Sequence, residues 1–174
     1  MKQIVKMIMI LVLIVPMALA GQIKLGIDVL EENGFDVLKG KRVGLITNPT
    51  GVNRNLKSTV DILFEAPEVE LVALFGPEHG VRGNYAAGDR IENAVDPVTG
   101  VPAFSLYGRT NRPTEESLEN VDVLVFDIQD IGCRSYTYIS TMGYCMEAAA
   151  EFGKELVVLD RPNPLTGNIG EGAT

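Results

Sequence analysis

The stretch LFGPEHGVRG, residues 74–83, places Glu78 beside His79, the only histidine of the chain, directly after an apolar run. A glutamate in this position can serve as a general acid or base, with His79 as its neighbour or hydrogen-bond partner. It can equally belong to a polar turn in which the carboxylate caps the backbone. A metal site is disfavoured, because catalytic zinc usually needs three protein ligands and no metal-ligand spacing accompanies the pair.

Three other polar segments follow apolar runs in the same way. They are TNPTG (47–51), DIQDIGCRSYTY (127–138) and DRPNPLTG (160–167). The second combines carboxylates with Arg134, Tyr136 and Tyr138, which suits hydrogen bonding and stacking on a sugar ring. Two structural alternatives stay open. An aspartate of this segment could pair with Arg134 and cap the next helix, and Asp160 and Arg161 could form a structural salt bridge.

The elements that must position these side chains alternate along the chain. Strands are expected at 43–47, 69–76, 101–108, 121–128 and 154–160, and helices at 58–66, 113–120 and 136–153. This order predicts right-handed crossovers and an α/β fold, a Rossmann-like parallel sheet flanked by helices. Ligands of such sheets bind beyond the carboxyl ends of the strands, where the four polar segments fall. The glycine-rich stretch 80–100 lacks periodicity and predicts a long functional or mobile loop.

Two large cofactor classes are disfavoured by the sequence. No G-x-G-x-x-G fingerprint and no G-x-x-x-x-G-K-[ST] loop follows the first expected strand, which argues against nicotinamide and ATP enzymes. We expect no cofactor and no metal. The net charge of −8, without a basic cluster, argues against nucleic acid as a partner. A small neutral or glycan-like ligand is compatible with this charge.

Residues 1–20 combine Lys2 and Lys6 with an apolar run and the small residues Ala18 and Ala20. This pattern predicts a cleavable secretory signal peptide, and therefore a periplasmic or extracellular protein. The alternative, an uncleaved membrane anchor, is disfavoured because the apolar run is short for a spanning helix. No stable membrane insertion is expected after cleavage. Residues 21–174 are long enough for one domain with its own core.

The two cysteines are expected to remain free, although export makes a disulfide conceivable. Cys145 lies roughly 12 Å along the expected helix, at 1.5 Å per residue, whereas Cys133 precedes that helix. A bridge needs Cα atoms within about 7 Å. Two free and mostly buried thiols are therefore predicted.

Five strings, in chain order, carry a family resemblance: GLITNPTGV, LVALFGPEHGVRG, SLYG, VDVLVFDIQDIGCRSYTYISTM and VVLDRPNPLTG. From about Gly21 to Glu171 the chain resembles the NamZ-type exo-β-N-acetylmuramidases, exported bacterial glycosidases. The resemblance implies removal of terminal N-acetylmuramic acid from peptidoglycan fragments during cell-wall turnover and recycling. It also implies a Rossmann-like domain, a smaller C-terminal domain and an active site between them. The sequence stops at Thr174, where relatives continue, so we expect an N-terminal portion without the second domain.

Carried over onto this sequence, the resemblance makes Glu78 the expected general acid/base, with His79 beside it and Glu171 as the second carboxylate. The expected contacts to a muropeptide or disaccharide are Asn48, Arg82, Asp127, Gln129, Arg134, Tyr136, Tyr138, Asp160, Arg161 and Asn163. Glycosidases usually place two carboxyl groups around the scissile bond, although an N-acetyl group can assist the departure of its own sugar. The alternative function is a non-catalytic glycan-binding fragment of the cell-wall machinery, and a third is a degenerate remnant.

Overall fold

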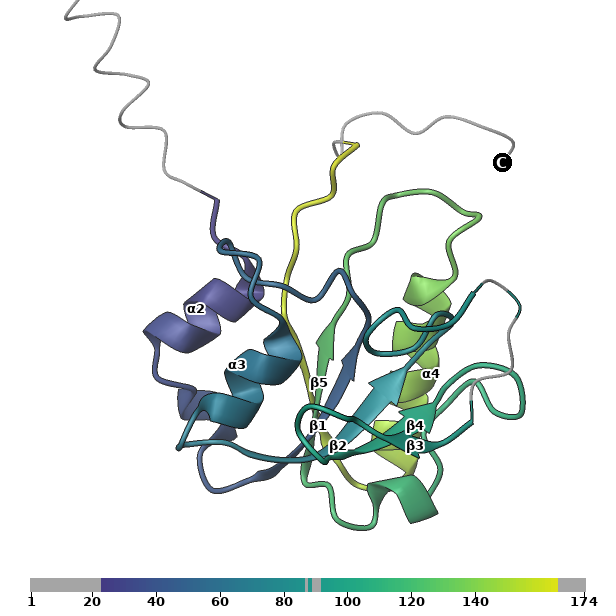
Figure 1. Ribbon diagram of the computed structural model, residues 1–174, viewed down its shortest axis with the longest axis horizontal. Coiled ribbons are helices and arrows are strands. Elements are labelled where there is room, and N and C mark those ends of the chain that lie inside the picture. Colours follow the sequence, from purple (N-terminus) through teal and green to yellow (C-terminus); the bar gives the residue numbers. More distant parts are fainter. Residues whose placement is uncertain (1–22, 87, 89–91, 166–174) are drawn as a thin grey trace, which may run out of the picture.

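The computed structural model describes residues 23–86, 88 and 92–165 (Figure 1). The expected signal peptide and Glu171 lie outside the described residues. The strands are β1 (Arg42–Thr47), β2 (Glu70–Gly76), β3 (Ala94–Val95), β4 (Pro102–Ser105), β5 (Val123–Asp127) and β6 (Glu155–Val158). The helices are α2 (Gly26–Glu32), α3 (Thr59–Glu65) and α4 (Tyr138–Glu151), with the short 3-10 helices η1 (Asp36–Leu38) and η2 (Glu116–Leu118).

The strands form one sheet in the order β3-β4-β2-β1-β5-β6. All neighbours run parallel except β3, which pairs antiparallel with β4. The chain moves outward from β1 through β2 to β4, returns to the other side of β1 for β5, and continues to β6. This doubly wound order has its switch point between β1 and β5. The expected α/β fold with a Rossmann-like parallel sheet is confirmed.

Helices cover both faces of the sheet, with α2 and α3 on one side and α4 on the other (Figure 1). Alternate strand residues point to opposite faces. Leu45 and Val125 accordingly join the apolar cluster under α2 and α3. Their neighbours Ile46 and Phe126 join the cluster under α4. The sheet is therefore buried on both faces at its centre. The loops that follow the strands leave this buried layer at its carboxyl edge.

Local sequence signals explain where the helices begin and end. The Ser58 hydroxyl accepts a hydrogen bond from the Val60 N–H at 3.2 Å, as an N-cap does, and α3 begins at the next residue. After α4, Gly153 adopts a φ of 63° and Lys154 N–H donates back to the Ala149 carbonyl, which ends the helix. On α3, Val60 and Leu63 are buried, whereas Phe64 is exposed.

Several further expectations need correction. The strand expected at 154–160 is the shorter edge strand β6, and two of its four positions are exposed. The segment 113–120 contains only the single turn η2, and the stretch 80–100 contains β3. Both cysteines are free as expected, but Cys133 is exposed. Burial raises the pKa of the Cys145 thiol to about 12.

None of the helices in the described part of the chain has both the length and the apolar character to cross a membrane.

Candidate functional site

Glu78 lies in a tight turn two residues beyond the end of β2. The Gly80 N–H donates to the Pro77 carbonyl at 2.9 Å and closes the turn. The third turn residue is His79, with a φ of 74°. A positive φ at this position is typical of a type II turn, which usually carries glycine or asparagine there. A histidine in this conformation is strained, and such strain is concentrated at functional sites.

The chain then folds back so closely that only glycine fits at the end of β2. A Cβ atom on Gly76 would lie 2.7 Å from the backbone nitrogen of Val81. The His79 imidazole faces the loop that follows, with Nδ1 at 3.1 Å from the Tyr85 carbonyl oxygen. This contact joins the turn to the loop that follows it. Among the described residues, no group of three His, Cys, Asp or Glu side chains could hold a metal ion.

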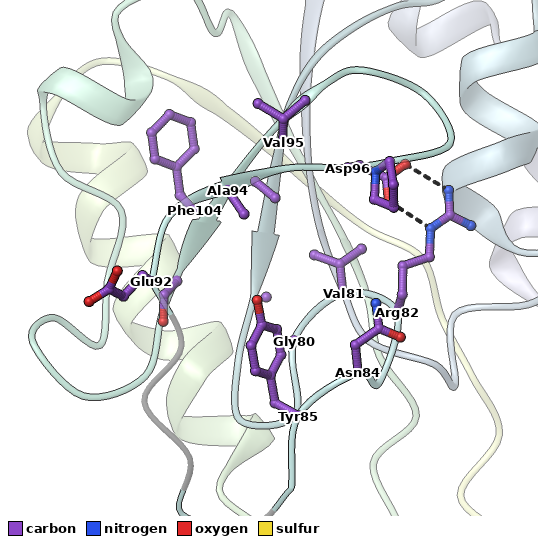
Figure 2. Close-up of a pocket in the computed structure, with 14 residues that line it drawn as sticks. Gly80, Val81, Arg82, Asn84, Tyr85, Glu92, Ala94, Val95, Asp96 and Phe104 are labelled. Carbon is purple, nitrogen blue, oxygen red and sulfur yellow. Dashed lines mark hydrogen bonds and ion pairs between the residues drawn. The ribbon is translucent and has the colours of Figure 1, made fainter.

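Arg82 anchors the far end of this turn. Its Nε and Nη2 donate to the two oxygens of Asp96, each at 2.9 Å, and Nη2 also donates to Asp61 at 2.8 Å. Figure 2 shows the forked contact of Arg82 with Asp96. The hydrogen bond from Arg82 lowers the pKa of the buried Asp96 carboxyl to about 2, and the same contact raises the pKa of Arg82. Two carboxylates hold its guanidinium in this structure, and the expected contact of Arg82 with substrate stays a prediction.

The Glu78 carboxylate is half-buried and has two described partners. Its Oε1 accepts a hydrogen bond from the Gly88 N–H at 3.2 Å. The phenol of Tyr107 is its second partner, and this side-chain hydrogen bond is the main cause of a raised pKa at Tyr107. A half-buried carboxylate with part of its surface open can both hold and release a proton, as acid/base work requires.

Glu78 opens into a cleft of about 330 Å³ whose lining comes from three strand-end segments. The lining residues are Pro77, Glu78, Leu106, Tyr107, Asn111, Thr137, Ser140, Thr141 and Tyr144. They follow β2 and β4 or form the first two turns of α4. Hydroxyl, amide and aromatic groups of this kind suit a neutral ligand rich in hydroxyls. Glu78 is the only carboxylate in the described lining.

Sequence reasoning did not assign Tyr107, Asn111, Ser140 or Tyr144 to the site. A signal for Tyr107 was available, because it lies two residues beyond the strand β4 and belongs to the string SLYG. The other three lie on a loop and on a helix whose faces sequence alone does not orient.

At the switch point between β1 and β5, two expected site residues instead bind each other. Arg161 donates from Nε and Nη2 to the two oxygens of Asp127, at 2.6 and 2.9 Å, and Nη2 also donates to the Val52 carbonyl. The Thr59 hydroxyl donates to Asp127 at 2.5 Å. The side chains of Arg161 and Asp127 are 5% and 0% exposed and form a buried ion pair. Their expected substrate contacts stay predictions.

This ion pair also decides the alternatives left open by the sequence. Asp127 pairs with Arg161, and not with Arg134. Arg161 pairs with Asp127 instead of Asp160. The side chain of Asp160 is exposed, and its backbone carbonyl accepts from the Gly26 N–H at 2.7 Å. The nearby Asp130 accepts from the Gly132 N–H at 2.7 Å.

Asn48 and Gln129 tie the central loops together. The buried Asn48 accepts at Oδ1 from the N–H and hydroxyl of Thr50, at 3.0 and 2.6 Å. The Gln129 amide donates to the carbonyls of Asp130 and Pro162, at 2.7 and 3.1 Å. Both amides hold loop conformations in this structure, and Gln129 links the loop after β5 to those after β1 and β6.

The remaining expected residues surround a second, smaller hollow. Tyr138, Asp160 and Arg161 line a hollow of about 130 Å³ between α4 and β6. Tyr136 packs edge-on against Tyr138, with ring centroids 6.1 Å apart. Arg134 is exposed on the loop before α4. None of these residues is among the described lining of the cleft that contains Glu78.

Asn163 lies beside the loop after β5. Its Oδ1 accepts from the Leu165 N–H at 2.8 Å, and its amide approaches Gly132 so closely that a Cβ there would lie 2.7 Å from Nδ2.

Comparison with known proteins fixes the family of this fold and turn. Residues 43–174 match the family described as exo-beta-N-acetylmuramidase NamZ, N-terminal. The chain belongs to this family. It is 60% identical over 151 residues to peptidoglycan beta-N-acetylmuramidase NamZ of Bacillus subtilis (strain 168), across 87% of this chain and 36% of that protein.

Two crystal structures of DUF1343 family proteins from Bacteroides fragilis NCTC 9343 share the fold. One has 64% sequence identity and a TM-score of 0.78, across 84% of this chain and 36% of that chain. The other has 40% identity and a TM-score of 0.68, across 83% and 36%. The chain therefore spans about a third of the length of these NamZ-family relatives, and corresponds to their N-terminal portion. The resemblance of the GPEHG and LDRPNP strings to this family is confirmed.

Proposed function

We propose that this protein acts as an exo-β-N-acetylmuramidase that releases terminal N-acetylmuramic acid from peptidoglycan fragments. One observation carries the proposal: in a chain of the NamZ family, Glu78 emerges from the carboxyl edge of the sheet into a cleft lined by hydroxyl, amide and aromatic groups. The named B. subtilis relative, a peptidoglycan β-N-acetylmuramidase, supports the same assignment.

Glu78 serves as the general acid/base of this proposed reaction. Its proton passes to the glycosidic oxygen as the bond to the sugar breaks, and the leaving alcohol departs neutral. A second group then stabilises or attacks the anomeric carbon. The described lining contains no other carboxylate, so this group comes either from a segment outside the described residues, such as Glu171, or from the acetamido group of the substrate. His79 supports the turn and is not a ligand of any metal in this scheme.

The proposal includes the setting of the reaction. An N-terminal signal peptide would deliver the protein to the periplasm or the cell exterior, where muropeptides and disaccharides arise during wall turnover. The reaction consumes water and needs no organic cofactor.

A chromogenic β-N-acetylmuramide, incubated with the full-length protein, tests the role of Glu78. Glu78→Gln should lower kcat/KM by about 10² to 10⁴, the usual contribution of a positioned acid/base. The matched control is Glu68→Gln, an exposed glutamate before β2, at the opposite edge of the sheet. Wild-type turnover by Glu78→Gln would exclude this role. Sugar binding without release by the wild-type protein would favour the glycan-binding alternative.

A further inference from the structure

Tyr107 is held beside Glu78 by an extension of the sheet. The Leu106 N–H donates to the carbonyl of Gly76 at 2.8 Å, which continues the pairing of β4 with β2 one residue past the end of β4. Ser105 then makes two hydrogen bonds to the backbone of Tyr107. Its hydroxyl donates to the Tyr107 carbonyl at 3.0 Å and accepts from the Tyr107 N–H at 3.1 Å. The backbone of Tyr107 is therefore fixed relative to the turn that bears Glu78.

The side chains of the two residues meet in the cleft. Both are half-buried and both line it. A phenol is protonated at neutral pH and an ionised carboxylate can only accept, so Tyr107 is the donor of the pair. The side-chain hydrogen bond to Glu78, and then the carboxylate charge, raise the pKa of Tyr107. A phenol that donates to a carboxylate forms a charge-assisted bond, which is shorter and stronger than a neutral one.

The two partners of Glu78 approach from different segments. Gly88 belongs to the loop after β2, whereas Tyr107 comes from the end of β4. An ionised carboxylate offers about four lone-pair sites. Two donors therefore leave part of it free for a substrate while fixing the plane of the group.

We propose that Tyr107 is a positioning residue, whose phenol donates to Glu78 and holds its carboxyl group in the orientation that faces the glycosidic oxygen. The inference rests on the proposed function, because it assigns to Tyr107 the orientation of the acid/base. Tyr107 itself takes no proton from the substrate. A glutamate side chain without this partner samples other rotamers, and small misplacements of a reacting group are costly in rate.

Kinetics of Tyr107→Phe in the full-length protein measure the effect. The phenylalanine ring fills the same space and lacks only the hydroxyl. Loss of one hydrogen bond to a charged group should lower kcat by about 10- to 100-fold, while KM changes little. Tyr85→Phe is the matched control, because it removes a phenol hydroxyl from the neighbouring hollow beside β3 and β4 but keeps the ring that packs on Gly80 and the carbonyl that His79 contacts (Figure 2).

A spectroscopic titration tests the contact without relying on turnover. In protein labelled at the tyrosine rings, the NMR signal absent from Tyr107→Phe identifies Tyr107. Its pKa should lie above the ordinary value in the wild-type protein and should fall in Glu78→Gln, with no such fall in Glu68→Gln. Unchanged titration in Glu78→Gln would refute the contact, and with it the positioning role.

The outcomes separate the two proposals. If Glu78→Gln is inactive but Tyr107→Phe retains wild-type kcat, the positioning role fails and the proposed function stands. If Glu78→Gln is fully active, the acid/base role and the positioning role both fall, whatever the titration shows. A melting temperature close to wild type in Tyr107→Phe confirms that a lower kcat reflects orientation and not unfolding.

Discussion

Asp96→Asn tests how much the ion pair between Arg82 and Asp96, next to the Glu78 turn, contributes to folding stability, and the structure sets the size of the effect. The buried Asp96 carboxyl has a pKa of about 2, against an ordinary value of 3.8, chiefly because Arg82 donates to it. At 1.36 kcal/mol per pKa unit, this difference corresponds to about 2.5 kcal/mol of folding free energy. Asparagine keeps the shape and one acceptor oxygen, but it removes the charge that Arg82 faces.

The sign of the pH dependence follows from the lowered pKa. A carboxyl group whose pKa is lower in the folded state stabilises the protein fully above its unfolded pKa, and this contribution is lost as the pH falls through the folded value. The free energy of unfolding of the variant should therefore be lower by about 2.5 kcal/mol above pH about 5. The difference in the free energy of unfolding between the wild-type protein and the variant (the gap) should then disappear between pH about 4 and about 2.

Urea unfolding, followed by circular dichroism over this pH series, measures the gap directly. Other carboxyl groups titrate in both proteins, so the difference isolates Asp96. Asp36→Asn, an exposed carboxylate at the start of η1, is the control and should show no such closing gap. A gap that stays constant with pH would refute the reasoning, because it would show that charge on Asp96 does not contribute to stability.

Three further changes test other parts of the framework. Arg161→Met should lower the free energy of unfolding, measured in urea titrations, by about 3–5 kcal/mol. The reason is that the substitution leaves the Asp127 charge buried without its partner. A loss below about 1 kcal/mol would contradict the ion pair. Ser58→Ala should cost about 1 kcal/mol through loss of the α3 cap, and a neutral result in the same assay would argue against that cap. In native protein a maleimide should label the exposed Cys133 and spare Cys145, whose thiol is buried with a pKa of about 12, until denaturant is added. Mass spectrometry of both peptides reports this, and equal labelling in the native state would contradict the burial.

The central fold could be predicted because its signals are local. Continuous apolar runs over β1, β2 and β5 fit strands buried on both faces, and Ser58 and Gly153 mark helix ends through hydrogen bonds within one turn. The less regular elements had weaker signals. Helix α2 begins after Leu25, which provides no side-chain cap, and only two of its seven residues, Ile27 and Leu30, are buried apolar side chains. The two-residue strand β3 exists only because β4 is there to pair with it.

The sequence predicted what kind of groups line the cleft, but it predicted only some of the residues that do so. The rule that polar residues after parallel strands gather at one edge selected Glu78 correctly for the open cleft. It also selected Asp127 and Arg161, which lie 34 residues apart and neutralise each other. Sequence spacing cannot reveal such a pairing, since nothing local distinguishes a strand-end charge with a buried partner from one without.

The residue at which each strand ends decides whether a nearby carboxylate is buried in an ion pair or lines an open cleft. Asp127 is the last paired residue of β5, opposite Thr47 of β1, and the Thr47 hydroxyl donates to its carbonyl at 2.8 Å. A carboxylate inside the central ladder is covered by neighbouring strands and needs a buried cation. Glu78 lies two residues past Gly76, where the chain has already turned out of the sheet, so its carboxylate reaches solvent and needs only hydrogen-bond donors. A shift of two residues along a strand end thus separates a structural charge from one that is free to act on a ligand.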